Sequence, residues 1–98
     1  MAITFAFIGH APPETSAAAS AYEDEAIPLF ADHGGELLSR VRRRPDQDPA
    51  LPWEVHLFRF PDHDALAAYL ADPRRAALLE RYGEVFSSKQ TIEVDVID

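Results

Sequence analysis

Apolar residues recur along four segments of the chain in the patterns typical of β-strands. Residues 2–9 are almost entirely apolar, with only Thr4 polar, which predicts a central strand covered on both faces. Residues 53–60 also place apolar side chains on both faces and predict a second central strand. Residues 36–43 alternate more loosely, and residues 90–97 alternate with one apolar face, so each segment predicts a further strand.

The region between the first two strands carries apolar residues at helical spacings of three and four, starting after Pro12-Pro13. This spacing predicts a helix that runs to about His33. Pro28 lies inside the pattern, where it removes a backbone donor, so a kink near Asp24 or a break into two shorter helices is expected. The acidic residues of this helix, such as Glu23, are expected to point mostly away from its apolar face.

A second helical region follows the third strand. Asp62 supplies an N-cap, and Asp72-Pro73 repeats the same start signal. Apolar residues continue at helical spacing as far as Phe86. The region therefore predicts two consecutive helices or one bent helix.

The element order is βαββαβ. With right-handed crossovers, this order gives an α+β fold of ferredoxin-like topology, with a four-stranded antiparallel sheet and helices on one face. The first and third strands are then central, in agreement with their doubly apolar patterns. Because helices cover only one face, the apolar residues of the other face predict a homodimer packed sheet to sheet, with residues 1–98 forming a single domain.

Composition narrows the function classes. Nine basic residues against seventeen acidic ones give a formal net charge of -8, which argues against nucleic-acid binding. No apolar run approaches the roughly 20 residues that span a bilayer. The chain has no Cys, and therefore no thiolate zinc site and no cysteine nucleophile. We expect a cytoplasmic protein without a nucleic-acid or membrane partner.

His56 is the most interesting titratable residue, because it lies in mid-strand on the same face as Phe58 and Phe60. If that face meets the helices, His56 could act as a general acid or base near neutral pH. The alternative is a core histidine with one hydrogen bond, or a structural partner for Glu54 or Tyr69. The alternative is favoured because the sequence shows no recognisable carboxylate that would orient the ring.

The other three histidines have different settings. His10 ends the first strand beside Gly9, where a ligand could approach the backbone, so it is the second candidate for proton transfer; an exposed turn histidine is the alternative. His33 closes the first helix, where its cation would be favoured by the helix C-terminus. His63 lies between two aspartates and is expected to be solvated.

Metal and cofactor signals are missing from the sequence. The histidines share no H-x-x-x-H or H-x-E spacing. Gly34-Gly35 lacks the residues of a phosphate-binding loop. Neither a metal nor an organic cofactor is therefore expected.

Six aromatic residues could line a pocket for an aromatic ligand, although plain core packing is the commoner role at such spacings. Trp53, directly after Pro52, is the one expected at a pocket mouth or dimer edge, on the strand face opposite His56. The six candidates for substrate binding are Tyr22, Trp53, Phe58, Phe60, Tyr69 and Phe86.

Four of the nine basic residues form one cluster: Arg40, Arg42, Arg43 and Arg44. This cluster could pair with the acidic loop that contains Asp46 and Asp48, reach across a dimer to Glu93 or Asp95, or bind an anionic ligand; ion pairing is favoured. Arg59 is expected on the dimer face, where it needs a carboxylate such as Glu93 or Asp95.

Through a further set of residues, the chain resembles the dimeric α/β-barrel superfamily. It is most similar to a bacterial group of largely unknown function that is related to antibiotic-biosynthesis monooxygenases. The residues that carry the resemblance are Tyr22, Ile27-Pro28, His33-Gly34-Gly35, residues 54–61, Asp62, Asp72-Pro73, Ala76 and Leu79. They span almost the whole chain and are mostly turns, caps and core positions. The resemblance implies a cavity for small hydrophobic ligands between sheet and helices. Relatives in this superfamily include cofactor-independent monooxygenases, lactone isomerases and haem-degrading enzymes, and the last hold iron through a histidine that residues 73–86 lack.

The leading hypothesis is therefore a cofactor-independent oxygenase, isomerase or cyclase that acts on a hydrophobic metabolite, whether or not this metabolite is aromatic. His56 or His10 would transfer the proton, and Tyr22 and Tyr69 would orient a hydroxyl or carbonyl group. The alternative is a non-catalytic homodimer, either ligand-binding or structural, whose cavity is closed by phenylalanines. A third hypothesis is a regulatory interaction module that uses the arginine cluster.

Overall fold

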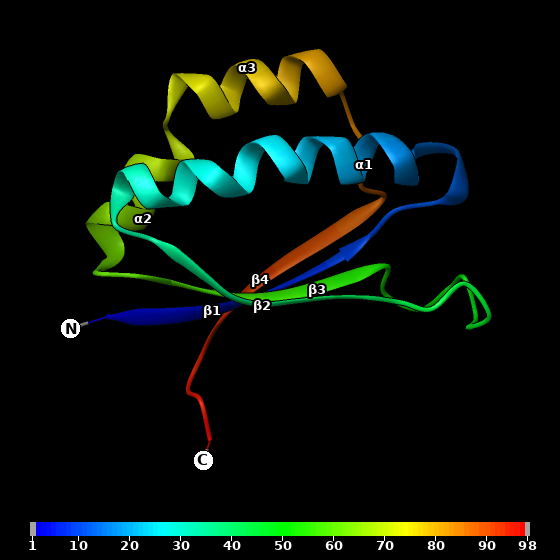
Figure 1. Cartoon of the computed structure of the whole chain (residues 1–98), viewed down its shortest axis with the longest axis horizontal. Coiled ribbons are helices and arrows are strands. Elements are labelled where there is room, and N and C mark those ends of the chain that lie inside the picture. Colours follow the sequence, from blue (N-terminus) through cyan, green and yellow to red (C-terminus); the bar gives the residue numbers. More distant parts are fainter. Residues whose placement is uncertain (1, 98) are drawn as a thin grey trace.

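The computed structural model describes residues 2–97, which form a four-stranded antiparallel sheet with all helices on one face (Figure 1). The strands lie in the order β2-β3-β1-β4, so the two strands with doubly apolar sequences are central. The ferredoxin-like prediction is confirmed. Its elements are β1 (Ile3–His10), α1 (Pro13–Ala26), η1 (Ile27–His33), β2 (Glu36–Arg42), β3 (Glu54–Phe60), α2 (His63–Leu70), α3 (Pro73–Tyr82) and β4 (Ser88–Val94).

The first helical region divides into an α-helix and a 3₁₀ helix. α1 ends at Ala26 and η1 begins at Ile27, so the predicted break into two helices is present, just before Pro28, and not the kink near Asp24. A proline is tolerated in the first turn of a helix, where its missing N–H has no intrahelical partner. The chain therefore ends one helix and starts another at this point, and Gly34 closes η1 with a φ of 75°.

The second helical region forms two helices, each started by an aspartate. Asp62 accepts a hydrogen bond from the backbone N–H of Ala65 at 2.8 Å, and Asp72 accepts one from that of Arg74 at 2.8 Å. α3 ends at Tyr82, so the predicted continuation to Phe86 is wrong. Residues 83–87 instead connect α3 to β4, which begins and ends earlier than residues 90–97 suggested.

The side chains of β3 alternate between the two faces of the sheet. Glu54, His56, Phe58 and Phe60 are buried toward the helices, and the residues between them are half-buried on the other face. Trp53 was expected on the face opposite His56, and this prediction is wrong. Trp53 precedes the strand and is buried at 5% exposure with Ala19 and Val85 in the core on the helix side. The alternation of β3 cannot be extended to Trp53 because the strand starts only at Glu54.

The face of the sheet away from the helices is apolar. Ala6 on β1 lies between Leu57 on β3 and Ile92 on β4, and Val55 on β3 pairs with Val41 on β2. Val41 is 56% exposed and Ile92 is 46% exposed. No described helix covers these residues (Figure 1).

Candidate functional site

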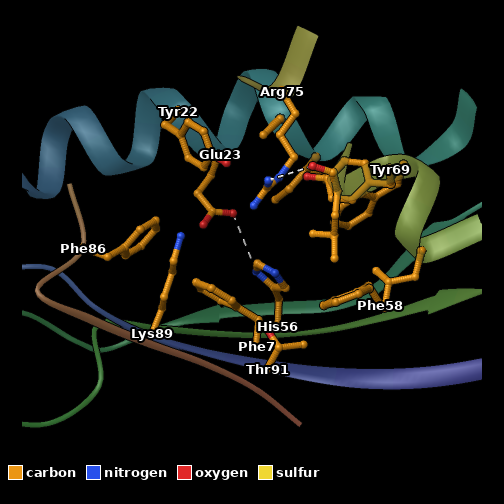
Figure 2. A pocket seen from close by; sticks show the side chains of 15 residues that line it. Phe7, Tyr22, Glu23, His56, Phe58, Tyr69, Arg75, Phe86, Lys89 and Thr91 are labelled. Atoms are coloured by element: carbon orange, nitrogen blue, oxygen red, sulfur yellow. Dashed lines mark hydrogen bonds and ion pairs between the residues drawn. The ribbon is translucent and has the colours of Figure 1, made fainter. Parts of the chain in front are cut away.

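A cavity of about 300 Å³ lies between the helices and the sheet (Figure 2). Its floor is formed by β1, β3 and β4, and its walls come from α1, η1, α2, α3 and the segment before β4. Most of the lining is apolar, with Phe7, Phe58 and Phe86 prominent. The polar side chains on the lining are Tyr22, Glu23, His56, Tyr69, Arg75, Lys89 and Thr91.

His56 is 4% exposed and points from β3 into this cavity. Its Nδ1 atom lies 3.3 Å from Oε2 of Glu54 and 3.8 Å from Oε2 of Glu23. The ring of Phe7 stacks on the imidazole, with 4.5 Å between the ring centres. Glu54 is one of the two partners that the alternative interpretation of His56 named, whereas Glu23 was not expected beside it.

Glu54 is held as a carboxylate by two arginines of the neighbouring strand. Its Oε1 atom accepts hydrogen bonds from Arg40 Nε at 3.0 Å and from Arg42 Nη2 at 2.7 Å. The β2–β3 register places Arg42 opposite Glu54 and Arg40 opposite His56. Burial raises the pKa of Glu54, but the hydrogen bonds from His56 and the arginines outweigh it and lower the pKa to about 2.

Glu23 has the opposite ionisation behaviour. It lies on α1, is buried at 4% exposure, and points into the cavity instead of away from the apolar face, so that expectation was wrong. Burial, together with the negative charge of Glu54, raises the pKa of Glu23 to about 8. At neutral pH the site therefore combines a protonated Glu23 with an ionised Glu54.

This arrangement determines how the proton of His56 is placed. Because Glu54 is ionised, Nδ1 of His56 carries a hydrogen and donates it to Glu54. In the neutral imidazole, Nε2 is then the acceptor, and it has no hydrogen-bond partner among residues 2–97. A carboxylate-oriented histidine with a free Nε2 in a cavity is the arrangement that general-base catalysis requires.

The same three residues also bring together groups that can bind a metal ion. Ligand atoms of Glu23, Glu54 and His56 lie within 4.8 Å of one another, which the sequence did not indicate because the residues come from α1 and β3. Two guanidinium groups already bind Glu54 and balance its charge, and Glu23 is protonated at neutral pH. A divalent cation would have to compete with both, so the residues fit an acid–base cluster better than a cation site.

Four of the six aromatic candidates line the cavity, namely Tyr22, Phe58, Tyr69 and Phe86. Phe60 and Trp53 do not: Phe60 is fully buried in the core, and Trp53 packs beneath Arg42, whose guanidinium lies 4.3 Å from its ring centre. Burial raises the pKa of Tyr69 to about 12, against the opposing charge of Arg75. Both tyrosines, Tyr22 included, therefore stay protonated at neutral pH.

The remaining histidines lie outside the cavity. His10 borders a separate depression with Pro49 and Ser87, so it does not join His56. His33 bonds to Oδ2 of Asp72 through Nε2 at 2.8 Å, and thus links η1 to α3. His63 is exposed, as expected, and lies 2.8 Å from Glu93.

The arginine cluster is divided among several partners. Arg40 and Arg42 bind Glu54, and Arg44 lies 3.4 Å from Asp46. Arg43 donates to the carbonyl oxygen of Leu51 at 2.8 Å.

The favoured ion-pair interpretation therefore applies to three of the four arginines, but the main partner is Glu54. Arg59 pairs with Glu36 at 3.1 Å, not with Glu93 or Asp95.

Arg75 and Lys89 are cavity residues that the sequence analysis missed. Arg75 lies in the first turn of α3, and Lys89 lies on β4 opposite Gly9. Neither has a neighbour in the sequence that suggests a site. Only the packing of α3 and the pairing of β4 bring them to His56.

No protein-family model matches the chain, and no curated protein matches it significantly. Solved structures do. A proposed antibiotic biosynthesis monooxygenase from Bacteroides thetaiotaomicron aligns over 99% of this chain and 90% of that chain, with a TM-score of 0.75 and 15% identity. A NIPSNAP family protein of unknown function from Agrobacterium tumefaciens aligns over 95% and 86%, with a TM-score of 0.72 and 17% identity.

A DABB family protein with a ferredoxin-like fold from Mesorhizobium loti aligns over 99% of this chain and 98% of that chain, with a TM-score of 0.66 and 15% identity. At these identities the similarities establish the fold alone. The ferredoxin-like fold that the resemblance implied is confirmed. No helix within residues 2–97 is long and apolar enough to cross a membrane.

Proposed function

We propose that this protein is a cofactor-independent enzyme that removes a proton from a hydrophobic, aromatic small molecule, with His56 as the base. The observation that carries the proposal is the buried Glu54–His56 pair, whose Nε2 is free within a largely apolar cavity of about 300 Å³. Cavities of this size accommodate small ligands. The similarity in fold to a proposed antibiotic biosynthesis monooxygenase supports it.

Oxygenation, isomerisation and cyclisation of such molecules share a first step. A C–H proton made acidic by an adjacent or conjugated carbonyl group is removed, and an enolate remains. His56 would take that proton at Nε2, and Glu54 would stabilise the imidazolium that forms. Tyr22 and Tyr69 would donate hydrogen bonds to the substrate oxygen as its negative charge develops.

The proposed enzyme is a homodimer of one domain, residues 1–98. The rows of exposed apolar residues on the open sheet face support a second copy packed against it. The cavities lie on the other side of each sheet, so each protomer keeps its own His56.

The test measures the shared first step. Anthrone and 2-tetralone, which have acidic C–H groups on fused rings, are incubated with the protein in D₂O, and deuterium incorporation is followed by NMR. The wild-type protein should accelerate exchange above the buffer rate for at least one of them. Oxygen uptake measured in parallel identifies an oxygenase.

His56→Gln should reduce the exchange rate by about a hundredfold or more, the usual contribution of a general base. His63→Gln, which changes an exposed histidine outside the cavity, is the matched control and should exchange at the wild-type rate. Exchange that survives His56→Gln but is lost in His10→Gln would overturn the assignment of the base. Binding of these compounds without any exchange would favour the non-catalytic ligand-binding dimer.

A further inference from the structure

The cationic side chains of this chain are nearly all neutralised within it. Six of the eight arginines lie within 4.0 Å of a carboxylate oxygen: Arg40, Arg42, Arg44, Arg59, Arg74 and Arg81. Arg43 instead donates to loop carbonyls. Among the described residues, Arg43, Arg75 and the only lysine, Lys89, have no carboxylate partner, and of these three only Arg75 and Lys89 line the cavity.

The guanidinium group of Arg75 has no anionic partner within residues 2–97. It lies in the first turn of α3, where the helix dipole disfavours a cation. Its Nη1 donates to the carbonyl oxygen of Leu70 at 3.3 Å, its guanidinium lies 5.5 Å from the ring centre of Tyr69, and its buried Nε has no partner among the described residues. The adjacent Arg74, in contrast, pairs with both Asp32 and Asp72.

Lys89 reaches the same cavity from the sheet (Figure 2). The pairing of β1 with its two neighbours places Lys89 and Glu54 on either side of Gly9. Thr91, two residues further along β4, also lines the cavity. The ammonium group therefore lies on the side of the cavity floor that carries the acid–base residues.

The cavity thus has two cations and one carboxyl group, Glu23, on its wall, in a protein whose formal net charge is -8. Burial and the neighbouring Glu54 raise the pKa of Glu23 to about 8, so Glu23 is largely protonated at neutral pH. Apolar rings beside the half-buried Arg75 weaken its screening by water, whereas Lys89 is exposed where it lines the cavity. A neutral ligand would leave both cations without a counter-charge.

We propose that the ligand of this cavity is an aromatic carboxylic acid, whose carboxylate is bound by Arg75 and whose negative charge is also balanced by Lys89. The inference rests on the proposed function, because it names the substrate class of the same cavity. Arg75 supplies several N–H donors in the planar arrangement that suits a carboxylate. Lys89 supplies a second positive charge, which also stabilises the enolate formed when His56 removes a proton.

The test compares two probes of nearly the same shape, 2-naphthoate and the uncharged 2-naphthalenemethanol. Isothermal titration calorimetry at low ionic strength should show that the wild-type protein binds 2-naphthoate at least about tenfold more tightly, the scale of a charge-assisted hydrogen bond. Arg75→Met and Lys89→Met should each remove most of this preference. Arg75→Lys should keep part of it.

Arg81→Met is the matched control. It removes one positive charge from α3, but Arg81 pairs with Glu25 outside the cavity, so the preference should persist. Lys89 offers an independent readout because it is the only lysine. Reductive methylation, located by mass spectrometry, should slow at Lys89 when 2-naphthoate is present and should not change with 2-naphthalenemethanol.

The outcomes separate this inference from the proposed function. Equal affinity for the two probes would overturn the carboxylate assignment, while the deuterium exchange catalysed by His56 would still stand. If Arg81→Met abolishes the preference as fully as Arg75→Met does, the carboxylate assignment is also overturned. The preference would then come from the overall positive charge of α3 and not from direct contact with Arg75. Failure of both probes to bind at millimolar concentration would overturn the assignment together with the aromatic ligand class.

Discussion

The ionisation of Glu54 and the orientation of His56 on β3 depend on two arginines of the neighbouring strand β2. In the β2–β3 register, Arg40 lies opposite His56 and Arg42 lies opposite Glu54. Their charges keep Glu54 ionised, and Glu54 in turn orients His56. The chemistry proposed for His56 therefore depends on residues that need not touch the ligand.

Glu23 makes stability depend on pH. Its pKa is about 8 in the native protein and about 4.3 in an unfolded chain. The native state thus holds a proton that the unfolded state releases, so the stabilisation is complete below about pH 4.3 and is lost as the pH rises toward 8. Glu54, whose pKa is lowered to about 2, acts in the opposite direction but only in more acidic solution, as the pH falls from about 4.3 toward 2.

We expect the free energy of unfolding of the wild-type protein to fall by a few kcal/mol between pH 5 and pH 8, at up to about 1.4 kcal/mol for each unit of raised pKa. Glu23→Gln should remove most of that decline. Urea denaturation at the two pH values measures the difference. Glu14→Gln, at an exposed position in the first turn of α1, should follow the wild-type profile; an unchanged slope in Glu23→Gln would contradict the prediction.

At the scale of elements, aspartates at helix N-termini connect local and tertiary structure. Asp62 caps α2 at an exposed site. Asp72 caps α3 and also accepts hydrogen bonds from the side chains of Arg74 and His33. These two partners hold the pKa of Asp72 below its usual range. His33 therefore ties η1 to α3.

Removing the two caps should have unequal effects. Asp62→Ala should lower the free energy of unfolding by about 1 kcal/mol, the usual cost of losing an N-cap. Asp72→Ala should cost more, because it also leaves His33 and Arg74 without their shared partner. Chemical denaturation of both variants checks this order, and equal losses would show that the His33–Asp72 contact adds nothing.

At the scale of the whole molecule, one layer of helices on one sheet leaves much surface open. The chain spans 39 × 37 × 17 Å and exposes 6123 Å², against roughly 5,600 Å² for a compact monomer of its 10.9 kDa mass. The apolar rows on the open sheet face account for part of this excess. A second copy would bury them.

We expect light scattering after size-exclusion chromatography to give twice the chain mass of 10.9 kDa. Leu57→Lys, in the centre of the open face, should shift the protein to the monomer mass, because a charge there would be buried without a partner. Leu70→Lys, at an exposed position on the helix side, should remain dimeric. A wild-type monomer at micromolar concentration would contradict the proposed assembly.

The sequence by itself determined the elements, because their signals are local. The doubly apolar residues 2–9 and 53–60 identify the central strands, and Asp72-Pro73 identifies a helix start. Errors occurred at the ends of two elements, although Gly83, with a φ of 71°, is a local signal for the end of α3. Trp53 lies just before β3 and so leaves its alternation, and Phe86 follows a helix that ends at Tyr82.

Only the tertiary structure decided which residues form the site. His56, Tyr22 and Tyr69 were candidates from sequence, but Glu23 was expected to point elsewhere, and Arg75 and Lys89 carried no signal. The side of α1 that faces the sheet depends on contacts between residues far apart in the chain. The registers of β2 with β3 and of β1 with β4 depend on such contacts as well. Periodicity reports which side of an element is apolar, whereas packing and strand pairing determine which charges meet there.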